Sequence, residues 1–472
     1  MKIPIWREIF PLIFELRSGF KDKRCFNWAC VVIMAFCMGL GPSGSVTEIV
    51  RYFSLNPRTY TSLLGFFSSS AVYIEKLPVL LLQTLMAKVT TVKLGEYHLF
   101  AVDEIKYGKE GKRMPAVKLT YQSSDNNSKP SYIMGHSILC VALMAKGLLG
   151  QIAAMPILVR ILGGIKRSPN DRRNLVNTTV EEIHRLLEKS GISKAIFVAD
   201  AWYCIQTFIR PLMSGGTNII SRVKANAIAY NLPPIESKVR RGRKKKYGSK
   251  VRISSIFKNL NLFETAPSPL PGETCTIRYC SLLLTPRWLG IIVRYVFVIH
   301  PTRGKIALLS TDINLEILDI YVAYYERFKI ELTFKNMVYV IGAFTYRFWS
   351  KIMKPIKRGS RDQYVHRASR KYKAAVFAKL RSYHVYMMCA AIACCLNQYL
   401  ALYHPTRVWK SFNGWLRTIN PNSTPSVEVT ANALSETLEE FLTGKHVDRN
   451  LAKFISQKRK KTKTKMPFAA SG

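Results

Sequence analysis

The first 92 residues place apolar positions at helical spacing between short polar turns. Ser45, with Glu48 three residues later, is typical of a helix N-terminus, and Asn56-Pro57 indicates another one before the run RTYTSLLGFFSS. Two short helices with basic and aromatic residues near their turn would suit docking onto DNA in the manner of a helix-turn-helix. A plain helical bundle fits the same pattern. We expect a helical N-terminal DNA-binding region over residues 1–92.

The pattern then changes to short apolar runs bounded by polar turns, which indicate strands. Three such runs, EYHLFAVDE, AVKLTYQSS and YIMGHSILCVALMA, follow one another and predict a meander. A helix that begins at Thr178 or Thr179 and ends at Gly191 comes next, and the strand AIFVAD closes on Asp200. Strands first, then a helix and a further strand, predict a mixed sheet flanked by helices. This is an α/β (α+β) core, and its first part covers residues 93–218.

Strand and helix patterns also divide the rest of the chain. A β-rich stretch holds five strand candidates around KVRRGRKKKYGSK, a basic run too polar to pack, and Leu315 to Tyr339 has the pattern of one long helix. Tyr383 to Tyr403 is long and apolar enough for a membrane span, but polar side chains interrupt it, so we expect a buried helix and no membrane partner. The expected segments are a β-rich insertion (219–310), the last part of the core (311–360), a helical C-terminal region (361–445) and a basic disordered tail (446–472).

The charge of the chain narrows the choice of partner. Its 472 residues include 71 Lys and Arg against 29 Asp and Glu, which gives a formal net charge of +42. Such an excess repels itself in the folded state and is tolerated where a polyanion neutralises it. An anionic membrane or RNA would satisfy the same charge, and DNA is favoured only once the motifs below are added.

The ten cysteines include no CxxC pair. Cys275 and Cys280 are the nearest approach to a pair of metal ligands, and buried thiols in a strand core are the alternative that we favour. The N-terminal run MKIPIWREIFPLIFELRSGF is broken by charges and lacks the pattern of a signal peptide. Together these features predict a cytoplasmic protein with reduced cysteines.

Acidic residues are scarce, so those that end apolar strands stand out. Asp103 closes HLFAV and Asp200 closes AIFVA, so two strands deliver a carboxylate at the same kind of position. A single aspartate of this kind is more often a strand terminator or helix cap than a ligand. The pair, in a basic chain, instead indicates phosphodiester chemistry, which uses two Mg²⁺ ions held by two or three carboxylates from rigid elements.

A third carboxylate is expected on the long helix. Tyr324, Arg327 and Glu331 are spaced i, i+3, i+7, which places them on one helical face at about 100° per residue, and Lys335 extends that stripe. Glu326 falls roughly 140° from Glu331 and is excluded from the cluster. On this face Arg327 and Lys335 would bind DNA phosphates, and Tyr324 would hydrogen-bond to one. Without the two aspartates, the same stripe would indicate an ordinary amphipathic helix.

The order of these motifs resembles that of the DDE transposases of bacterial insertion sequences. AVDE, FVADAWY, a β-rich insertion and YYERFKIELTFK follow one another as in the group with a β-strand insertion between the second Asp and the Glu. In that group the Glu lies in a helix signature of Tyr, two residues, Arg, three residues, Glu, six residues, Lys. Tyr324, Arg327 and Glu331 match it, but position 338 is Val338, and Lys335, one turn earlier, is the candidate substitute.

This resemblance implies a ribonuclease H-like core that binds two Mg²⁺ ions, or Mn²⁺ as a substitute, through Asp103, Asp200 and Glu331. It implies cleavage of double-stranded DNA at terminal inverted repeats, after which the 3′-hydroxyl attacks across the duplex or on target DNA. Such enzymes work as dimers or larger assemblies, so a homodimer is expected here. Their DNA substrate would place the protein on the bacterial nucleoid.

The insertion in such proteins often carries a basic segment, and an aromatic residue in it can hold a flipped base. A tryptophan in a strand is more often part of a core. The further candidate DNA-binding residues are Arg222, Arg241, Arg243 and Trp288.

Two other functions fit the same residues. One is a nuclease of this core that only hydrolyses DNA, and the other is a basic DNA-binding protein without an active site, such as an inactive remnant of a transposase. The extended insertion and the terminal DNA-binding segments favour end recognition, and therefore transposition, over hydrolysis alone. The presence of all three carboxylates beside Tyr324 and Arg327 argues against a loss of activity.

Overall fold

The computed structural model describes residues 4–122, 130–171, 173–234, 245–444 and 447–460. The chain divides into two compact units. One unit comprises residues 75–335 and 349–380, and the other comprises residues 1–74, 336–348 and 381–472. The first unit contains the large mixed sheet, and the second is helical.

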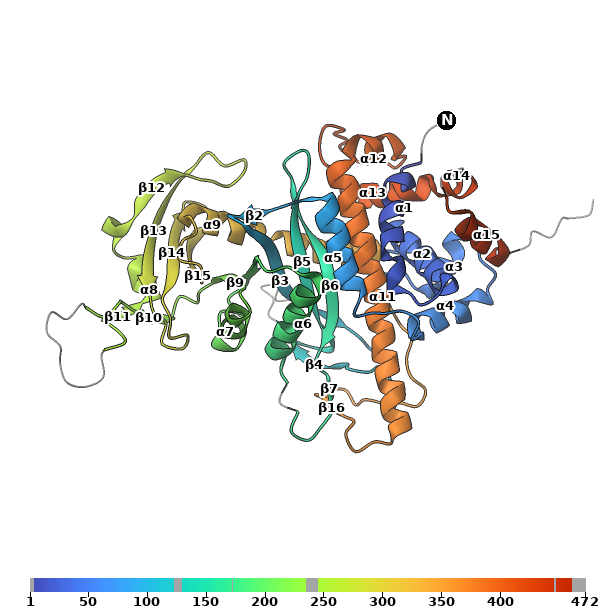
Figure 1. The fold of residues 1–472 in the computed structure, drawn as a ribbon, viewed down its shortest axis with the longest axis horizontal. Helices are drawn as coiled ribbons and strands as arrows, with labels where there is room; N and C mark the ends of the chain where they lie inside the picture. Colours follow the sequence, from blue (N-terminus) through green and yellow to red (C-terminus); the bar gives the residue numbers. More distant parts are fainter. Residues whose placement is uncertain (1–3, 123–129, 172, 235–244, 445–446, 461–472) are drawn as a thin grey trace, which may run out of the picture. The chain divides into compact units, whose positions relative to one another are not determined.

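Five strands form the core of the first unit (Figure 1). They are β3 (Tyr97–Gly108), β5 (Tyr132–Lys146), β6 (Ile152–Leu162), β8 (Ala195–Ala199) and β9 (Asn218–Arg222). Their order is β6-β5-β3-β8-β9. The first three are antiparallel neighbours, and β8 runs parallel to both β3 and β9. This order confirms the ribonuclease H-like core, but the meander differs from the predicted one. The second predicted strand is only the short β4 (Lys118–Tyr121), which pairs with β5, and the third antiparallel strand is β6, which the sequence pattern did not identify.

Helices α5, α6 and α7 lie next to one another along this sheet (Figure 1). They are α5 (Leu77–Lys88), α6 (Leu175–Ser190) and α7 (Gln206–Ser214). α6 begins earlier than the sequence pattern predicts, because the Asn174 side chain accepts a hydrogen bond from Asn177 N at 2.8 Å and caps the helix in place of the two threonines. It ends as expected at Gly191, which takes the left-handed conformation with φ of 73°.

Four strands of the insertion after β9 continue the same sheet, and two others form a separate two-stranded sheet. Its elements are β10 (Ile228–Tyr230), β11 (Lys250–Arg252), α8 (Ile253–Ile256), a 3₁₀ turn (Leu260–Leu262), β12 (Glu264–Pro267), β13 (Thr276–Leu284), β14 (Val293–His300) and β15 (Gly304–Ser310). β15 pairs antiparallel with β9, with Leu308 opposite Arg222, and β14, β13 and β12 follow outward. Residues 219–222, grouped with the insertion on their sequence pattern, therefore lie in the core as part of β9.

The single long helix expected after the insertion is interrupted. The observed segments are α9 (Ile317–Glu326), α10 (Lys329–Asn336) and a π-helical turn (Met337–Ile341). The interruption falls at Arg327 and Phe328. There the backbone N–H groups of Ile330 and Glu331 donate to carbonyl oxygens three residues earlier, as in a 3₁₀ turn, instead of four.

Residues 349–380 return to the core through short pairings. β16 pairs parallel with β7, and the Gln363 side chain accepts a hydrogen bond from Ala116 N and donates one to Val117 O at 2.9 Å. Lys118 forms an ion pair with Asp362 at 3.2 Å. The short strands of this unit are β1 (Thr90–Thr91), β2 (Lys93–Leu94), β4 (Lys118–Tyr121), β7 (Ile165–Lys166) and β16 (Gln363–Tyr364).

The helical unit joins both ends of the chain. Trp6 is fully buried, and its Nε1 donates to Leu434 O at 2.8 Å across 428 positions of sequence. Ser45 is the N-cap of α3, as predicted. The helices of this unit are α1 (Trp6–Glu15), a 3₁₀ turn (Leu16–Gly19), α2 (Lys23–Cys37), α3 (Val46–Tyr52), α4 (Thr59–Ser68), α11 (Arg370–Tyr403, from Arg381 onward), α12 (Pro405–Ser411), α13 (Val427–Glu436), α14 (Leu438–Thr443) and α15 (Arg449–Lys458).

Two segments of this unit bear on the sequence predictions. The expected disordered tail is in part the helix α15, which Asp448 caps and whose apolar face buries Leu451 and Ile455. The rest of that tail, residues 461–472, lies outside the described residues. Among the described helices, α11 alone is long and apolar enough to cross a membrane, and 94% of its apolar window is buried inside the protein.

His136 on β5 makes the core sensitive to acid. Its side chain is fully buried, and Nε2–H donates to Pro115 O at 2.9 Å. Burial lowers the pKa of His136 to about 3. Below about pH 6.5 the unfolded chain therefore binds a proton that the folded chain does not bind. Stability present above pH 6.5 is lost as the pH falls, by about 1.4 kcal/mol per pH unit.

We expect His136→Gln to flatten this pH dependence. Between pH 6.5 and pH 5 the unfolding free energy of the variant should fall less steeply with pH, by up to about 1.4 kcal/mol per pH unit, which is the contribution of one proton. This difference in slope is expected whatever stability the substitution removes at pH 7.5. Urea unfolding of both proteins at each pH measures the slope. An unchanged slope would contradict a neutral, buried His136.

Candidate active site

Asp103 and Asp200 come from adjacent parallel strands. The register pairs Val102 of β3 with Ala199 of β8, and Asp103 and Asp200 are the residues that directly follow this pair. Asp200 directly follows β8, as expected, whereas β3 continues to Gly108 and holds Asp103 inside it, where its parallel pairing stops. The carboxyl groups are close enough for the charge of Asp200 to raise the pKa of Asp103.

The guanidinium group of Arg327 joins two of the three predicted carboxylates. Its Nη1 donates to Asp103 Oδ2 and its Nη2 donates to Glu331 Oε1, each at 2.9 Å. The side chains of Arg327 and Asp103 are only 13% and 20% exposed, whereas that of Glu331 is 44% exposed. The contact with Asp103 is therefore shielded from water, and the contact with Glu331 is screened by it.

Burial and charge oppose each other at Asp103. The net effect raises the pKa of its carboxyl group to about 6: desolvation is the largest cause, the positive charge of Arg327 and a backbone hydrogen bond from Glu104 lower the pKa, and the charges of Asp200 and Glu331 raise it. Across the described residues, the carboxylate oxygens of these three residues do not all lie within 4.8 Å of one another. Carboxylate oxygens are hard donors of the kind that a divalent cation such as Mg²⁺ prefers, so the residues fit such an ion.

Glu326 is not part of this cluster. Its side chain is 5% exposed, its cationic neighbour is Lys329 at 4.0 Å, and burial raises its pKa. Lys335 is exposed on α10, and Val338 lies in the π-helical turn. The neighbouring acids Glu326 and Glu331 thus have different surroundings, and only Glu331 contacts Arg327.

A cavity of about 580 Å³ opens beside Asp200. Tyr324 lines it, with its ring centre 5.7 Å from the Arg327 guanidinium, and burial raises the pKa of the Tyr324 hydroxyl. Phe257 adds a second aromatic side chain to the wall. The cations that line the cavity are Arg222, Lys224, Lys258, Lys305 and Arg327.

The structure brings together only some of the predicted DNA-binding residues. Arg222, Tyr324 and Arg327 line the cavity, whereas Trp288 is partly buried in the connection between β13 and β14 and is not among the lining residues. Arg241 and Arg243 lie outside the described residues.

Sequence reasoning missed Lys224, Lys258 and Lys305. They come from a loop after β9, a loop after α8 and strand β15, so no spacing along the chain relates them.

A search against family models finds a match over residues 15–279 to the family described as DDE superfamily endonuclease. This is more than half of the chain. The chain belongs to the DDE endonuclease superfamily. The matched segment includes Asp103 and Asp200 and ends before Glu331.

Comparison of this DDE endonuclease with curated proteins finds no match. Among solved structures it is similar to the piggyBac transposase in a cryo-EM synaptic complex with hairpin DNA, at 12% sequence identity and a TM-score of 0.36. That alignment covers 94% of this chain and 78% of the other. DDE nucleases typically use divalent metal ions, and carboxylates such as those of Asp103 and Asp200 are suitable ligands for them.

The role of Arg327 in this DDE endonuclease can be tested by a double-mutant cycle without metal. Arg327→Met leaves Asp103 buried without its counter-charge, so we expect a loss on the order of 2 kcal/mol of unfolding free energy in urea at pH 7.5. In an Asp103→Asn background the same change should remove less than about 1 kcal/mol.

The cycle of Arg327→Met with Glu331→Gln is the matched control. Its coupling should stay below about 0.5 kcal/mol because Glu331 is largely solvated. Additive losses for Arg327 and Asp103 would show that the buried ion pair does not stabilise the site.

Proposed function

We propose that this chain is a DNA transposase that cleaves phosphodiester bonds at the ends of a transposon and joins the freed ends to target DNA. The observation that carries the proposal is that Asp103 and Asp200 lie next to each other on adjacent parallel segments and that Arg327 joins Asp103 to Glu331. Carboxylates delivered by rigid elements around a shared positive charge suit metal-dependent phosphoryl transfer. The order of the motifs along the chain supports an origin in a bacterial insertion sequence of the β-insertion group.

In this proposal Asp103, Asp200 and Glu331 hold two Mg²⁺ ions, for which Mn²⁺ can substitute. When bound, the ions activate the attacking oxygen and stabilise the leaving oxygen. Arg327, which neutralises Asp103 and Glu331 in their absence, becomes available to a DNA phosphate at the same place. Tyr324 donates its hydroxyl hydrogen to the phosphate backbone beside it, and Lys335 supplies a further cation on α10.

The basic cavity beside Asp200 supports DNA as the partner. Five cations line it, among them the predicted Arg222, within a chain whose net charge is +42. Phosphate groups of a DNA backbone neutralise such a surface and release their own counterions. We infer that the substrates are double-stranded terminal repeats and target DNA, bound by a homodimer so that both ends are cut together, on the nucleoid in the cytoplasm.

The test uses a plasmid in which a marker gene lies between the two DNA segments that flank the coding sequence of this protein. With Mg²⁺ or Mn²⁺ the purified wild type should excise the marker and join it to a target plasmid. Asp103→Asn, Asp200→Asn and Glu331→Gln should each lower both products by about 100-fold or more, because each removes several kcal/mol of metal-dependent stabilisation.

Glu326→Gln is the matched control, since it changes a nearby glutamate outside the cluster and should keep activity within about threefold. Equal losses for Glu326→Gln and Glu331→Gln would overturn the assignment of the third carboxylate. Cleavage without joining by the wild type would indicate a nuclease that only hydrolyses. DNA binding without cleavage would indicate an inactive remnant.

A further inference from the structure

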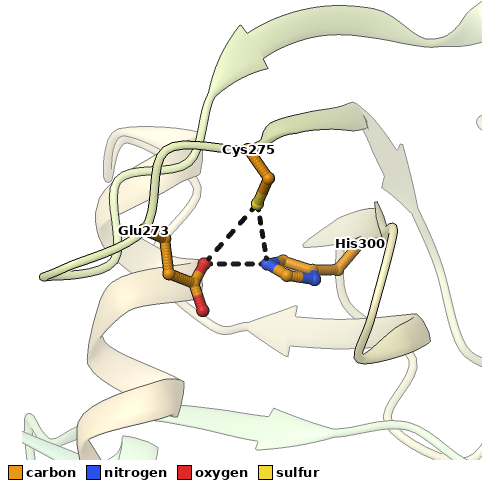
Figure 2. Close-up of side chains that lie close together, drawn as sticks. All are labelled: Glu273, Cys275 and His300. Atoms are coloured by element: carbon orange, nitrogen blue, oxygen red, sulfur yellow. Dashed lines mark hydrogen bonds and ion pairs between the residues drawn. The ribbon is translucent and has the colours of Figure 1, made fainter.

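A thiol, an imidazole and a carboxylate meet in the insertion, away from the residues assigned to DNA cleavage (Figure 2). His300 is the last residue of β14, Cys275 immediately precedes β13, and Glu273 lies two residues earlier in the loop from β12. Because β13 and β14 are antiparallel neighbours, the first residues of β13 and the last residues of β14 lie side by side at the same end of the pair. Among the described residues, this is the one group of His, Cys, Asp and Glu with three ligand atoms all within 4.8 Å.

The spacing of the three ligand atoms is close to that of a tetrahedral zinc site. Cys275 Sγ lies 3.4 Å from His300 Nε2, His300 Nε2 lies 2.8 Å from Glu273 Oε2, and Cys275 Sγ lies 3.9 Å from Glu273 Oε2. Bond lengths of about 2.3 Å to sulfur and about 2.0–2.1 Å to nitrogen and oxygen give tetrahedral edges of roughly 3.3–3.6 Å. Shifts of about half an ångström would therefore bring all three atoms onto one ion.

Surrounding hydrogen bonds orient the cluster. Arg303 donates from Nε and Nη2 to Glu273 Oε1 at 2.9 and 2.7 Å. Glu273 Oε2 accepts from Ser268 Oγ at 2.7 Å and faces the imidazole and the thiol (Figure 2). His300 Nδ1 accepts from the backbone N–H groups of Thr302 and Arg303 at 3.2 Å each, and Thr302 Oγ1 lies 3.2 Å from it. The other ring nitrogen, Nε2, therefore carries the proton that Glu273 Oε2 accepts at 2.8 Å. His300 is buried, whereas Glu273 and Cys275 are partly exposed, so an ion can enter from solvent.

We propose that Glu273, Cys275 and His300 form a Zn²⁺ site, with water or another small ligand at the fourth position. Thiolate and imidazole together select a borderline-soft divalent ion such as Zn²⁺ and not Mg²⁺. Binding releases the thiol proton of Cys275 to solvent. It also displaces the Nε2 proton of His300, which moves to Nδ1; there Thr302 Oγ1 accepts it, once the backbone N–H groups of Thr302 and Arg303 have turned away from Nδ1. The site joins the loop before β13 to the turn between β14 and β15.

The site is linked to the helix that leads to the cleavage centre. Arg303, held by Glu273, donates to the Tyr325 hydroxyl at 3.2 Å, and its guanidinium lies 4.6 Å from the centre of the Tyr325 ring. Tyr325 is on α9, directly after Tyr324 of the cavity wall. An ion that fixes Glu273 therefore also restrains Arg303 and this part of α9.

The experiment is a Co²⁺ and Zn²⁺ titration of the full chain after dialysis against a chelator. Co²⁺ is used because a thiolate ligand gives a charge-transfer absorption that carboxylates alone do not give. We expect one equivalent of Co²⁺ with this absorption, displacement by one equivalent of Zn²⁺, and no displacement by Mg²⁺ in excess. Zn²⁺ should also raise the unfolding temperature, since it binds the folded chain.

Variants locate the site. Cys275→Ser should abolish the charge-transfer absorption, and His300→Gln should weaken Co²⁺ binding at least tenfold. Cys280→Ser is the matched control, because Cys280 lies on the same strand β13 outside the cluster, and it should bind as the wild type does. Asp200→Asn should also retain full binding, which separates this site from the proposed cleavage centre.

Absence of the thiolate absorption at one equivalent in the wild type would overturn the proposal without reference to any variant. Equal loss of the absorption in Cys275→Ser and Cys280→Ser, with both proteins folded by circular dichroism, would overturn it as well.

Discussion

The ion pair between Arg327 and Asp103 joins parts of the chain that are 224 positions apart. Asp103 lies inside a strand of the core sheet, where removal from water makes its negative charge unfavourable unless a cation is near. Arg327 provides that cation from the interruption between α9 and α10, and the same guanidinium reaches Glu331. The buried aspartate, the interrupted helix and the exposed glutamate are therefore linked by one guanidinium group, and the proposed cleavage site depends on this link.

The pairing of β15 with β9 brings Arg327 to this place. The insertion extends the core sheet, so the segment that follows β15 begins close to β8 and β9. Helix α9 lies in this segment and packs against both strands. The same extension brings Lys305 on β15 and Lys258 after α8 to the cavity beside Asp200. The insertion thus contributes residues to the proposed cleavage centre through sheet pairing, and through Arg303 it also contacts Tyr325 on α9.

Local patterns were sufficient to predict the strands β3 and β5, the helix that ends at Gly191 and the strand before Asp200, because each depends on residues close in sequence; they did not identify β6, the third strand of the antiparallel group. Helical geometry also separated Glu331 from Glu326, although the real segment tightens to a 3₁₀ turn at Arg327 and Phe328. The i to i+4 contact between Arg327 and Glu331 survives that change. Features that depend on distant pairing could not be predicted. The contact of Trp6 with Leu434 spans 428 positions, and the partners of Cys275 proved to be Glu273 and His300, not Cys280.

The most direct measurement is anomalous X-ray diffraction from crystals of the protein grown with Mn²⁺. Arg327 holds the carboxylates of Asp103 and Glu331 as long as no metal ion is bound, and the account requires that bound ions replace it at Asp103. This account predicts Mn²⁺ peaks about 2.0–2.3 Å from carboxylate oxygens of Asp103 and Asp200, with Arg327 Nη1 no longer bonded to Asp103. Crystals without Mn²⁺ at these carboxylates, in which Arg327 still donates to both Asp103 and Glu331, would contradict it.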